Sequence, residues 1–171
     1  MPPDGRLAKG AVRRRALIAA TLRLVGRSGV AAVSQRAVAA EAGVPPSAVL
    51  YYYASVDGLL VSALREVNER YCAELAEITS IDDLAAHVAR YAALDRELVI
   101  AEYELWLLAA RREDLREELT TWDETVDALA ARLAPARADL LAAALNGLYL
   151  RAATTGVTAQ QALRTLTATT E

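Results

Sequence analysis

The sequence has very little of several residue types, and each shortage excludes a class of protein. It has one cysteine, Cys72, so it can form neither an intramolecular disulfide nor a cysteine-cluster metal site. It has one histidine, His87, so a histidine-based metal site lacks a second imidazole. Five prolines and eight glycines among 171 residues, with 54% apolar residues, argue against a disordered chain. We expect a folded protein with neither a metal ion nor another cofactor.

Long apolar runs and catalytic patterns are also missing. No apolar run reaches the length of a membrane span, and the N-terminus lacks the apolar core of a signal peptide, so we expect a cytoplasmic protein without a membrane partner. There is no Ser/His/Asp arrangement and no glycine-rich phosphate loop. Glu102 and Glu104 are two residues apart and cannot share one helix face, which weakens a carboxylate-pair mechanism. An enzyme is therefore disfavoured.

The net charge of −3 is distributed unevenly along the chain. Residues 1–60 contain eight basic and three acidic side chains, a net charge of +5, so the remaining residues carry −8. A solvated charge run is the ordinary explanation of such a bias. A split between two parts of one chain instead indicates that one part faces a polyanion and the other does not.

The periodicity of apolar residues predicts an all-α protein, because alanine dominates and runs of β-branched residues are almost absent. Residues 1–10 are predicted to form a disordered arm. Gly26 and Gly29 are expected to end the first helix, and Ser55 to cap the fourth. The predicted helices cover residues 11–27, 35–42, 47–53, 57–78, 81–94, 97–111, 114–133, 135–155 and 158–167.

The stretch from residue 34 to residue 53, SQRAVAAEAGVPPSAVLYYY, reads as two short helices around a tight turn. Ser34 is a suitable N-cap, Gly43 can adopt a positive φ and stop the first helix, and Pro46 can begin the second. The outward face of the second helix carries small, apolar and aromatic residues instead of charges. Such a helix suits insertion into a DNA major groove with its N-terminal end at the base edges. The alternative is a helix pair that serves only packing.

Residues from about 14 to 60 resemble the DNA-binding domain of the TetR (tetracycline repressor) family of bacterial transcription regulators. The sequence departs from the family pattern at Pro45, where a phosphate-contacting Ser or Thr is usual, at Leu50 in place of a frequent Tyr, and at Val56 in place of a frequent Lys. These departures affect individual phosphate contacts and not the fold. The matching residues are Leu17, Ala20, Leu24, Gly29, Val38, Ala39, Ala42, Gly43, Val44, Tyr52, Tyr53, Ser55, Asp57, Leu59 and Leu60.

The resemblance implies a three-helix helix-turn-helix domain with an N-terminal arm over residues 1–54 and a helical ligand-binding and dimerisation domain over residues 55–171. It further implies a repressor that binds a palindromic double-stranded DNA operator as a dimer and is released by a small molecule. We expect Arg36, Pro46, Ser47, Ala48 and Tyr51 to face bases. The full set of expected DNA-binding residues is Ser34, Gln35, Arg36, Pro46, Ser47, Ala48, Leu50, Tyr51 and Tyr52, in which Gln35 and Tyr52 mainly position the backbone.

Large aromatic residues in the acidic part point, by periodicity, toward a shared interior. They can be ordinary core filling, or they can line a mostly apolar cavity with a few polar tips. Members of the TetR family commonly hold such a cavity, and we therefore expect a small apolar or amphipathic ligand. His87 is either a hydrogen-bonded core residue or a polar contact for that ligand. The expected ligand-binding residues are His87, Tyr91, Tyr103, Trp106, Trp122 and Tyr149.

The predicted helix over residues 135–155 is apolar on nearly all sides, which is typical of a helix buried all round. A second subunit is the simplest cover for its second face, and the resemblance implies a homodimer joined through the last two helices. A central helix of a monomer is the alternative. The runner-up function is a helical ligand-binding or sequestering protein whose DNA-binding domain has decayed. One stripe holds Leu141, Leu145, Leu148 and Ala152; the opposite side holds Ala142, Ala143, Gly147, Leu150 and Ala153, which Leu163 and Leu166 could join.

Overall fold

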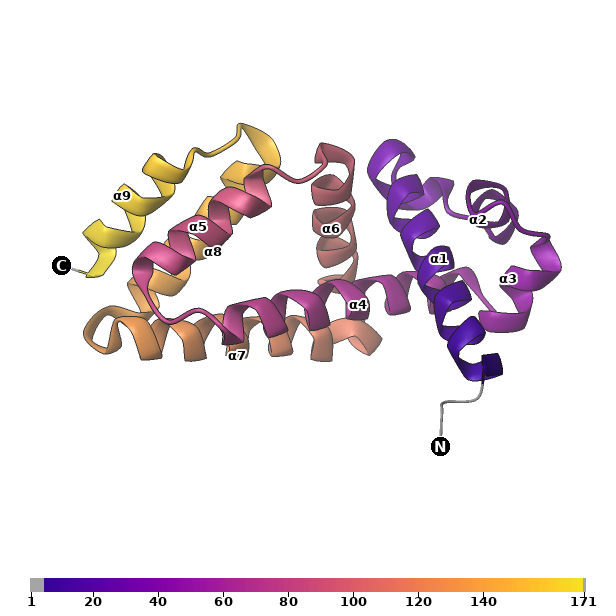
Figure 1. The fold of residues 1–171 in the computed structure, drawn as a ribbon, viewed down its shortest axis with the longest axis horizontal. Helices are drawn as coiled ribbons and strands as arrows, with labels where there is room; N and C mark the ends of the chain where they lie inside the picture. Colours follow the sequence, from indigo (N-terminus) through magenta and orange to yellow (C-terminus); the bar gives the residue numbers. More distant parts are fainter. Residues whose placement is uncertain (1–4, 171) are drawn as a thin grey trace. The chain divides into compact units, whose positions relative to one another are not determined.

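The computed structural model describes residues 5–170, and within that range every regular element is a helix (Figure 1). The predicted all-α fold is confirmed. Short 3-10 turns at Val30–Ala32, Glu113–Leu115 and Pro135–Arg137 connect some of the helices. The helices are α1 (Gly5–Ser28), α2 (Gln35–Glu41), α3 (Pro46–Tyr52), α4 (Val56–Ala76), α5 (Ile81–Ala92), α6 (Arg96–Ala109), α7 (Arg116–Leu133), α8 (Ala138–Thr154) and α9 (Ala159–Thr170).

The first helix is longer than predicted. It begins at Gly5, so the disordered arm expected over residues 1–10 is wrong for residues 5–10, while residues 1–4 lie outside the described range. Leu, Ala and Lys at positions 7–9 are strong helix formers, which explains the earlier start. Gly26 lies inside the helix and does not end it. The helix stops at Ser28, and Gly29 follows with a φ of 81°.

The chain forms two compact units. The head unit consists of the described residues up to 67 together with residues 97–111, and so contains α1, α2, α3, the first half of α4, and α6. The body unit consists of residues 68–96 and 112–170, and contains the second half of α4 with α5, α7, α8 and α9. The functional boundary expected after residue 54 stays a prediction.

Polar contacts hold the helices of the head unit together around an aliphatic core. Glu41 of α2 accepts hydrogen bonds from Arg23 and Arg27 of α1, each at 2.7 Å. Glu104 of α6 accepts a hydrogen bond at 3.0 Å from the backbone N–H of Val30, directly after α1. A Cβ atom at Gly26 would overlap the backbone carbonyl of Glu97, so glycine allows α1 and α6 to approach closely at that point.

The body unit is built from α7 packed on α8, with α5 and α9 packed on each other and on α8. Leu115 directly before α7 and Val126 and Leu129 on α7 are buried. Arg132 of α7 donates hydrogen bonds to the carbonyls of Leu75 and Ile78, at 3.2 and 2.8 Å. These bonds satisfy carbonyl groups at the C-terminal end of α4, which have no partner within the helix.

Only one apolar face of α8 is buried within the chain. Leu145 and Leu148 lie in the core of the body unit, and so does Leu166 of α9. The opposite side of α8 exposes Leu140 and Leu150, which keep 48% and 51% of their surface accessible. Ala143 and Gly147 are also exposed between them, giving positions 140, 143, 147 and 150 along one stripe. The inward-facing stripe is thus the one that includes Leu145 and Leu148.

Within residues 5–170 no single helix is both long and apolar enough to cross a membrane, and the only combination that meets both conditions is α3 with α4, bent by 66° between them.

Candidate DNA-reading surface and aromatic cluster

Local interactions shape the turn between α2 and α3 as the sequence predicts. The hydroxyl of Ser34 accepts a hydrogen bond from the N–H of Ala37 at 3.1 Å, which confirms the predicted N-cap of α2. Gly43 has a φ of 65°, a conformation that glycine adopts without strain. Pro46 is the first residue of α3, where its missing N–H removes no helical hydrogen bond. The two helices therefore form a helix-turn-helix with a rigid corner.

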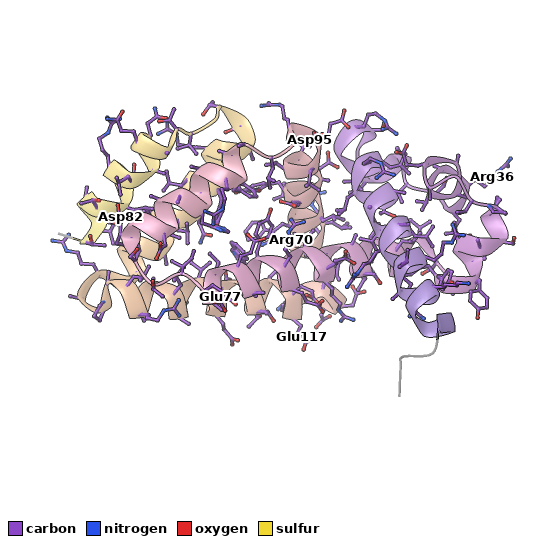
Figure 2. The ribbon with its side chains drawn as sticks, in the orientation of Figure 1. Arg36, Arg70, Glu77, Asp82, Asp95 and Glu117 are labelled. Atoms are coloured by element: carbon purple, nitrogen blue, oxygen red, sulfur yellow. The ribbon has the colours of Figure 1, made fainter. Side chains whose placement is uncertain are left out.

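The outward side of this motif is apolar and exposed. Tyr51 keeps 82% of its surface accessible and Leu50 keeps 52%. Val49, on the side of α3 that faces the core, is fully buried. Pro46 and Ser47 at the start of α3 are exposed as well. Figure 2 shows Arg36 directed from α2 away from the neighbouring helices, and it forms no ion pair with any described residue. We call the exposed residues of α2 and α3, Arg36, Pro46, Ser47, Leu50 and Tyr51, the reading surface.

Three of the expected DNA-binding residues also stabilise the head unit. Ser34 is the N-cap described above, and the amide of Gln35 donates hydrogen bonds to the carbonyls of Tyr53 and Ala54, at 3.3 and 3.2 Å. The ring of Tyr52 lies edge-on to Tyr51, with the ring centres 5.0 Å apart. Arg14 of α1 lies over the Tyr52 ring at 5.5 Å from its centre. Gln35 and Tyr52 therefore hold the end of α3 in place. Ala48 is only half-buried.

The basic side chains of the head unit fall into two groups. Arg23 and Arg27 bind Glu41, and the hydrogen bonds that they donate lower the pKa of the Glu41 carboxyl. The exposed side chains of Arg13, Arg14 and Arg15 on α1 form no ion pair with the described residues. With Arg36, these side chains are cations that can meet phosphate groups, and Lys9 near the start of α1 is exposed as well. Part of the positive charge counted in the sequence is thus consumed inside the head unit.

Five rings of the body unit form a second candidate site, which we call the aromatic cluster: Tyr71, His87, Tyr91, Trp122 and Tyr149. The rings meet edge-on, with centres 4.9 Å apart for Tyr91 and Tyr149 and 5.7 Å apart for Trp122 and Tyr149. Tyr71 of α4 lies 5.5 Å from Tyr91 and 6.3 Å from Trp122. The cluster thus draws on α4, α5, α7 and α8, and the expected ligand-binding residues did not include Tyr71.

His87 is the polar centre of the aromatic cluster. It keeps only 2% of its surface accessible, and within the described residues neither of its ring nitrogens has a hydrogen-bond partner. Its Nδ1 atom lies 3.5 Å from a carboxylate oxygen of Glu74, a residue of α4. Burial lowers the pKa of His87, an effect that Glu74 opposes and Arg90 reinforces. The buried ring is therefore neutral near pH 7, with one N–H and one acceptor nitrogen.

Polar groups border the aromatic cluster on several sides. The indole N–H of Trp122 donates a hydrogen bond to the amide oxygen of Asn146 at 3.3 Å. The guanidinium of Arg70 lies 4.5 Å from the centre of the Tyr71 ring, and Figure 2 labels Arg70 on α4. Cys72 is half-buried and lies 3.2 Å from the hydroxyl of Thr125. The cluster therefore combines ring surfaces with a few placed polar groups.

Two of the expected ligand-binding residues lie on α6 and so belong to the head unit. Trp106 is exposed, and Tyr103 is half-buried. Burial and the neighbouring Glu102 carboxyl raise the pKa of Tyr103 to about 12, so its hydroxyl stays protonated. The structure brings the other four expected residues together in the body unit.

The sequence matches two family models, one for each part of the chain. Residues 17–63 match the model described as bacterial regulatory proteins, tetR family. Residues 78–170 match the model of the tetracyclin repressor-like C-terminal domain. The HTH-type transcriptional regulator BetI of Rhizobium meliloti (strain 1021) is 30% identical over 158 residues, which cover 82% of this chain and 77% of BetI.

Solved structures resemble this chain over nearly its whole length. A member of the TetR family from Streptomyces coelicolor A3 is 36% identical, with a TM-score of 0.80 and coverage of 93% of this chain and 98% of that one. The multidrug binding protein EbrR complexed with malachite green is also 36% identical, with a TM-score of 0.75 and the same coverage of both chains. EbrR has also been solved with ethidium and with proflavin.

Proposed function

The chain belongs to the tetR family of bacterial regulatory proteins, and on that premise we propose that it represses transcription by binding a palindromic operator as a dimer, from which a small molecule releases it. As a member of this family it is a DNA-binding transcription regulator with a helix-turn-helix. The operator, the dimer interface, the ligand site and the residue roles are the proposed parts.

The exposed aromatic end of α3 is the observation that best supports the DNA-binding site. Most large apolar side chains of the head unit are buried, yet Tyr51 and Leu50 face solvent beside uncharged Pro46 and Ser47. Apolar side chains of this kind can contact thymine methyl groups and sugars in a major groove, and Arg36 can bind a guanine edge through two hydrogen bonds. Decay of the DNA-binding domain is not favoured, because the cap, the turn and the exposed face are all in place.

The uncovered side of α8 supports the dimer. Leu140, Ala143, Gly147 and Leu150 form an apolar stripe with small residues at its centre, which lets a second helix approach closely. A two-fold axis through this stripe would bring together two copies of α8 and their neighbouring α9 helices. Such a dimer presents two reading surfaces, which must lie about 34–36 Å apart, or a multiple of that, to enter successive major grooves.

The aromatic cluster supports the ligand site, since it combines large rings with few polar groups. Tyr71 of the cluster belongs to α4, the helix that continues into the head unit. A ligand that moves Tyr71 would therefore act on the helix that connects the body unit to the head unit. A ligand releases DNA only if it prefers a dimer geometry with the wrong spacing. A coupling of about 1–3 kcal/mol corresponds to DNA binding about 5–150-fold weaker, and DNA must weaken ligand binding equally.

Fluorescence anisotropy with duplexes selected from a random-sequence library tests the proposal. We expect selection of a palindrome, affinity that falls steeply with salt, and a stoichiometry of one dimer per duplex. Arg36→Ala should relax the preference at one base step at a cost of about 1–3 kcal/mol. Arg116→Ala at the start of α7 removes the same charge from an exposed position of the body unit outside the proposed dimer contact, and serves as the matched control.

The possible failures are distinguishable. Absence of salt-dependent binding to any duplex would contradict a repressor and favour the sequestering protein. If Arg36→Ala weakens all sequences equally, Arg36 contacts phosphate and its assignment to a base is wrong. If Arg116→Ala has the same effect as Arg36→Ala, the reading surface is placed wrongly.

A further inference from the structure

His87 is unusual because it is a buried polar side chain without a hydrogen bond. Nearly all buried polar groups in proteins have a hydrogen-bond partner, and leaving one unsatisfied costs about 1–3 kcal/mol. Neither ring nitrogen of His87 meets a donor or acceptor among the described residues, although 98% of its surface is buried. Retaining a histidine at such a place is explained if something that binds there supplies the missing hydrogen bond.

The position of Glu74 indicates which nitrogen of His87 carries the proton and which nitrogen is left as an acceptor. Its carboxylate lies 3.5 Å from Nδ1 of His87, which favours the tautomer that carries the proton on Nδ1. The Nε2 atom then presents a lone pair, so the group that it lacks is a hydrogen-bond donor. A ligand with an N–H or O–H can satisfy this atom, and a purely apolar ligand leaves it unsatisfied.

The surroundings of His87 favour a positively charged aromatic ligand. Tyr71 and Tyr149 lie edge-on to the His87 ring, with centres 6.4 and 6.0 Å away. Flat ligand rings can replace such ring–ring contacts by stacking, and cations bind over electron-rich ring faces. Glu74 contributes a negative charge beside His87 that a cationic ligand can neutralise, while Arg70 already occupies one face of the Tyr71 ring. A cationic ring system with an attached N–H group satisfies the rings, the carboxylate and Nε2 together.

We propose that the aromatic cluster binds flat aromatic cations carrying an N–H donor, and that this donor hydrogen-bonds to Nε2 of His87. The proposal rests on the ligand site of the proposed function and adds the chemical class of the ligand and the residue that selects it. EbrR, 36–38% identical to this chain, has been solved with proflavin, with ethidium and with malachite green. All three are aromatic cations, but malachite green has no N–H group, so the three dyes divide by the feature that His87 would recognise.

Two acridine cations with the same three-ring core provide the test. Proflavin carries amino N–H groups, whereas 10-methylacridine orange has the same ring system and charge with every N–H replaced by N–methyl. Both are titrated by fluorescence into full-length wild type, His87→Leu and His87→Gln. Any steric effect of the added methyl groups is present in every protein and cancels in the cycle formed by two dyes and two proteins. Thermal unfolding of each variant shows whether the substitution affects folding.

In the wild type we expect proflavin to bind about 10–100-fold tighter than the methylated dye, as a hydrogen bond to a charged donor is worth about 1.5–3 kcal/mol. His87→Leu should remove that difference by weakening proflavin alone, and His87→Gln should restore part of it. Glu74→Gln should weaken both dyes by a similar and small factor, because the Glu74 carboxylate is half exposed.

Three results would overturn the proposal: equal weakening of both dyes by His87→Leu, an unchanged preference for proflavin in that variant, or no binding of either dye. If His87→Leu does not fold, His87→Gln and the wild-type preference between the dyes decide the same question. The operator assay separates this failure from failure of the proposed function. If the dyes release DNA but their binding does not depend on His87, the proposed repressor function still holds and only the role of His87 is wrong. If binding depends on His87 but the dyes do not release DNA, only the proposed coupling between ligand and DNA binding is wrong.

Discussion

Tyr51 of the head unit and the tyrosines of the body unit have opposite surroundings. On α3 the ring of Tyr51 faces solvent, while Tyr71, Tyr91 and Tyr149 of the body unit are almost fully buried. Exposing a large ring to water gives up the free energy that burial would provide, so an exposed tyrosine beside uncharged residues indicates a surface that a partner covers. A buried tyrosine stabilises its own unit instead. The comparison shows that location, and not residue type, separates a tyrosine that can meet DNA from a tyrosine that packs inside its unit.

The same contrast occurs within a single helix. On α8, Leu148 lies in the core of the body unit and Leu150, two residues further, faces solvent. Residues two apart on a helix point about 200° apart, so the two side chains necessarily face different surroundings. Substitutions at such paired positions test whether the buried member affects stability and the exposed member affects binding to a partner.

The largest effect is expected from introducing a charge on α8. Leu148→Asp should prevent the body unit from folding, because an unpaired carboxylate in its apolar core costs several kcal/mol. Leu150→Asp should leave the helical circular dichroism unchanged but convert a dimer into a monomer in light scattering. A wild type that is monomeric at micromolar concentration, or a Leu150→Asp protein that stays dimeric, would contradict an interface on this side of α8.

The second largest effect is expected from truncating one tyrosine in each unit. Tyr91→Ala should lower the free energy of unfolding by about 3–5 kcal/mol, because a buried ring is lost and a cavity remains. Tyr51→Ala should change stability by less than about 0.5 kcal/mol, as is usual at exposed positions, while weakening operator binding. Urea unfolding and anisotropy measure the two quantities. Similar destabilisation by both variants would show that Tyr51 is a structural residue.

The smallest effect is expected from acidification. Because burial lowers the pKa of His87 in the folded state, the unfolded chain takes up a proton first, at about pH 6.5. Stability of the body unit should therefore be greatest above that pH and decrease as the pH falls toward the lower folded pKa. The charge of Arg90 increases this loss of stability at low pH. Glu74 decreases the loss, because its carboxylate can pair with the protonated His87 ring.

The head unit should respond at lower pH. The pKa of Glu41 is lowered by hydrogen bonds from Arg23 and Arg27, so its contribution is present above its unfolded pKa of about 4.3 and is lost as the pH falls through the folded value. Urea unfolding from pH 8 to pH 5 in wild type and His87→Gln measures the contribution of His87 to the body unit, and the same measurement below pH 5 in wild type follows the contribution of Glu41. A slope of equal size in both proteins would mean that another group is responsible.

The helix caps and the turn between α2 and α3 could be predicted from the sequence alone, because they depend on neighbouring residues. Ser34 caps α2, and the N–H of Gly58 donates to the hydroxyl of Ser55 at 3.0 Å, as the predicted caps require. Gly43 forms the turn and Pro46 begins α3. Each interaction spans only a few residues, so composition and order are sufficient to predict it.

Which residues from distant parts of the sequence lie side by side is known only from the tertiary structure. Periodicity showed that α8 has two apolar sides, but packing against α7 determined that Leu148 faces inward and Leu150 outward. Trp106 has the same aromatic character as Trp122, yet it lies with α6 in the head unit. The surroundings of His87 on α5 likewise depend on residues of α4 and α8. Such arrangements arise from contacts between residues far apart in the sequence, which local pattern does not encode.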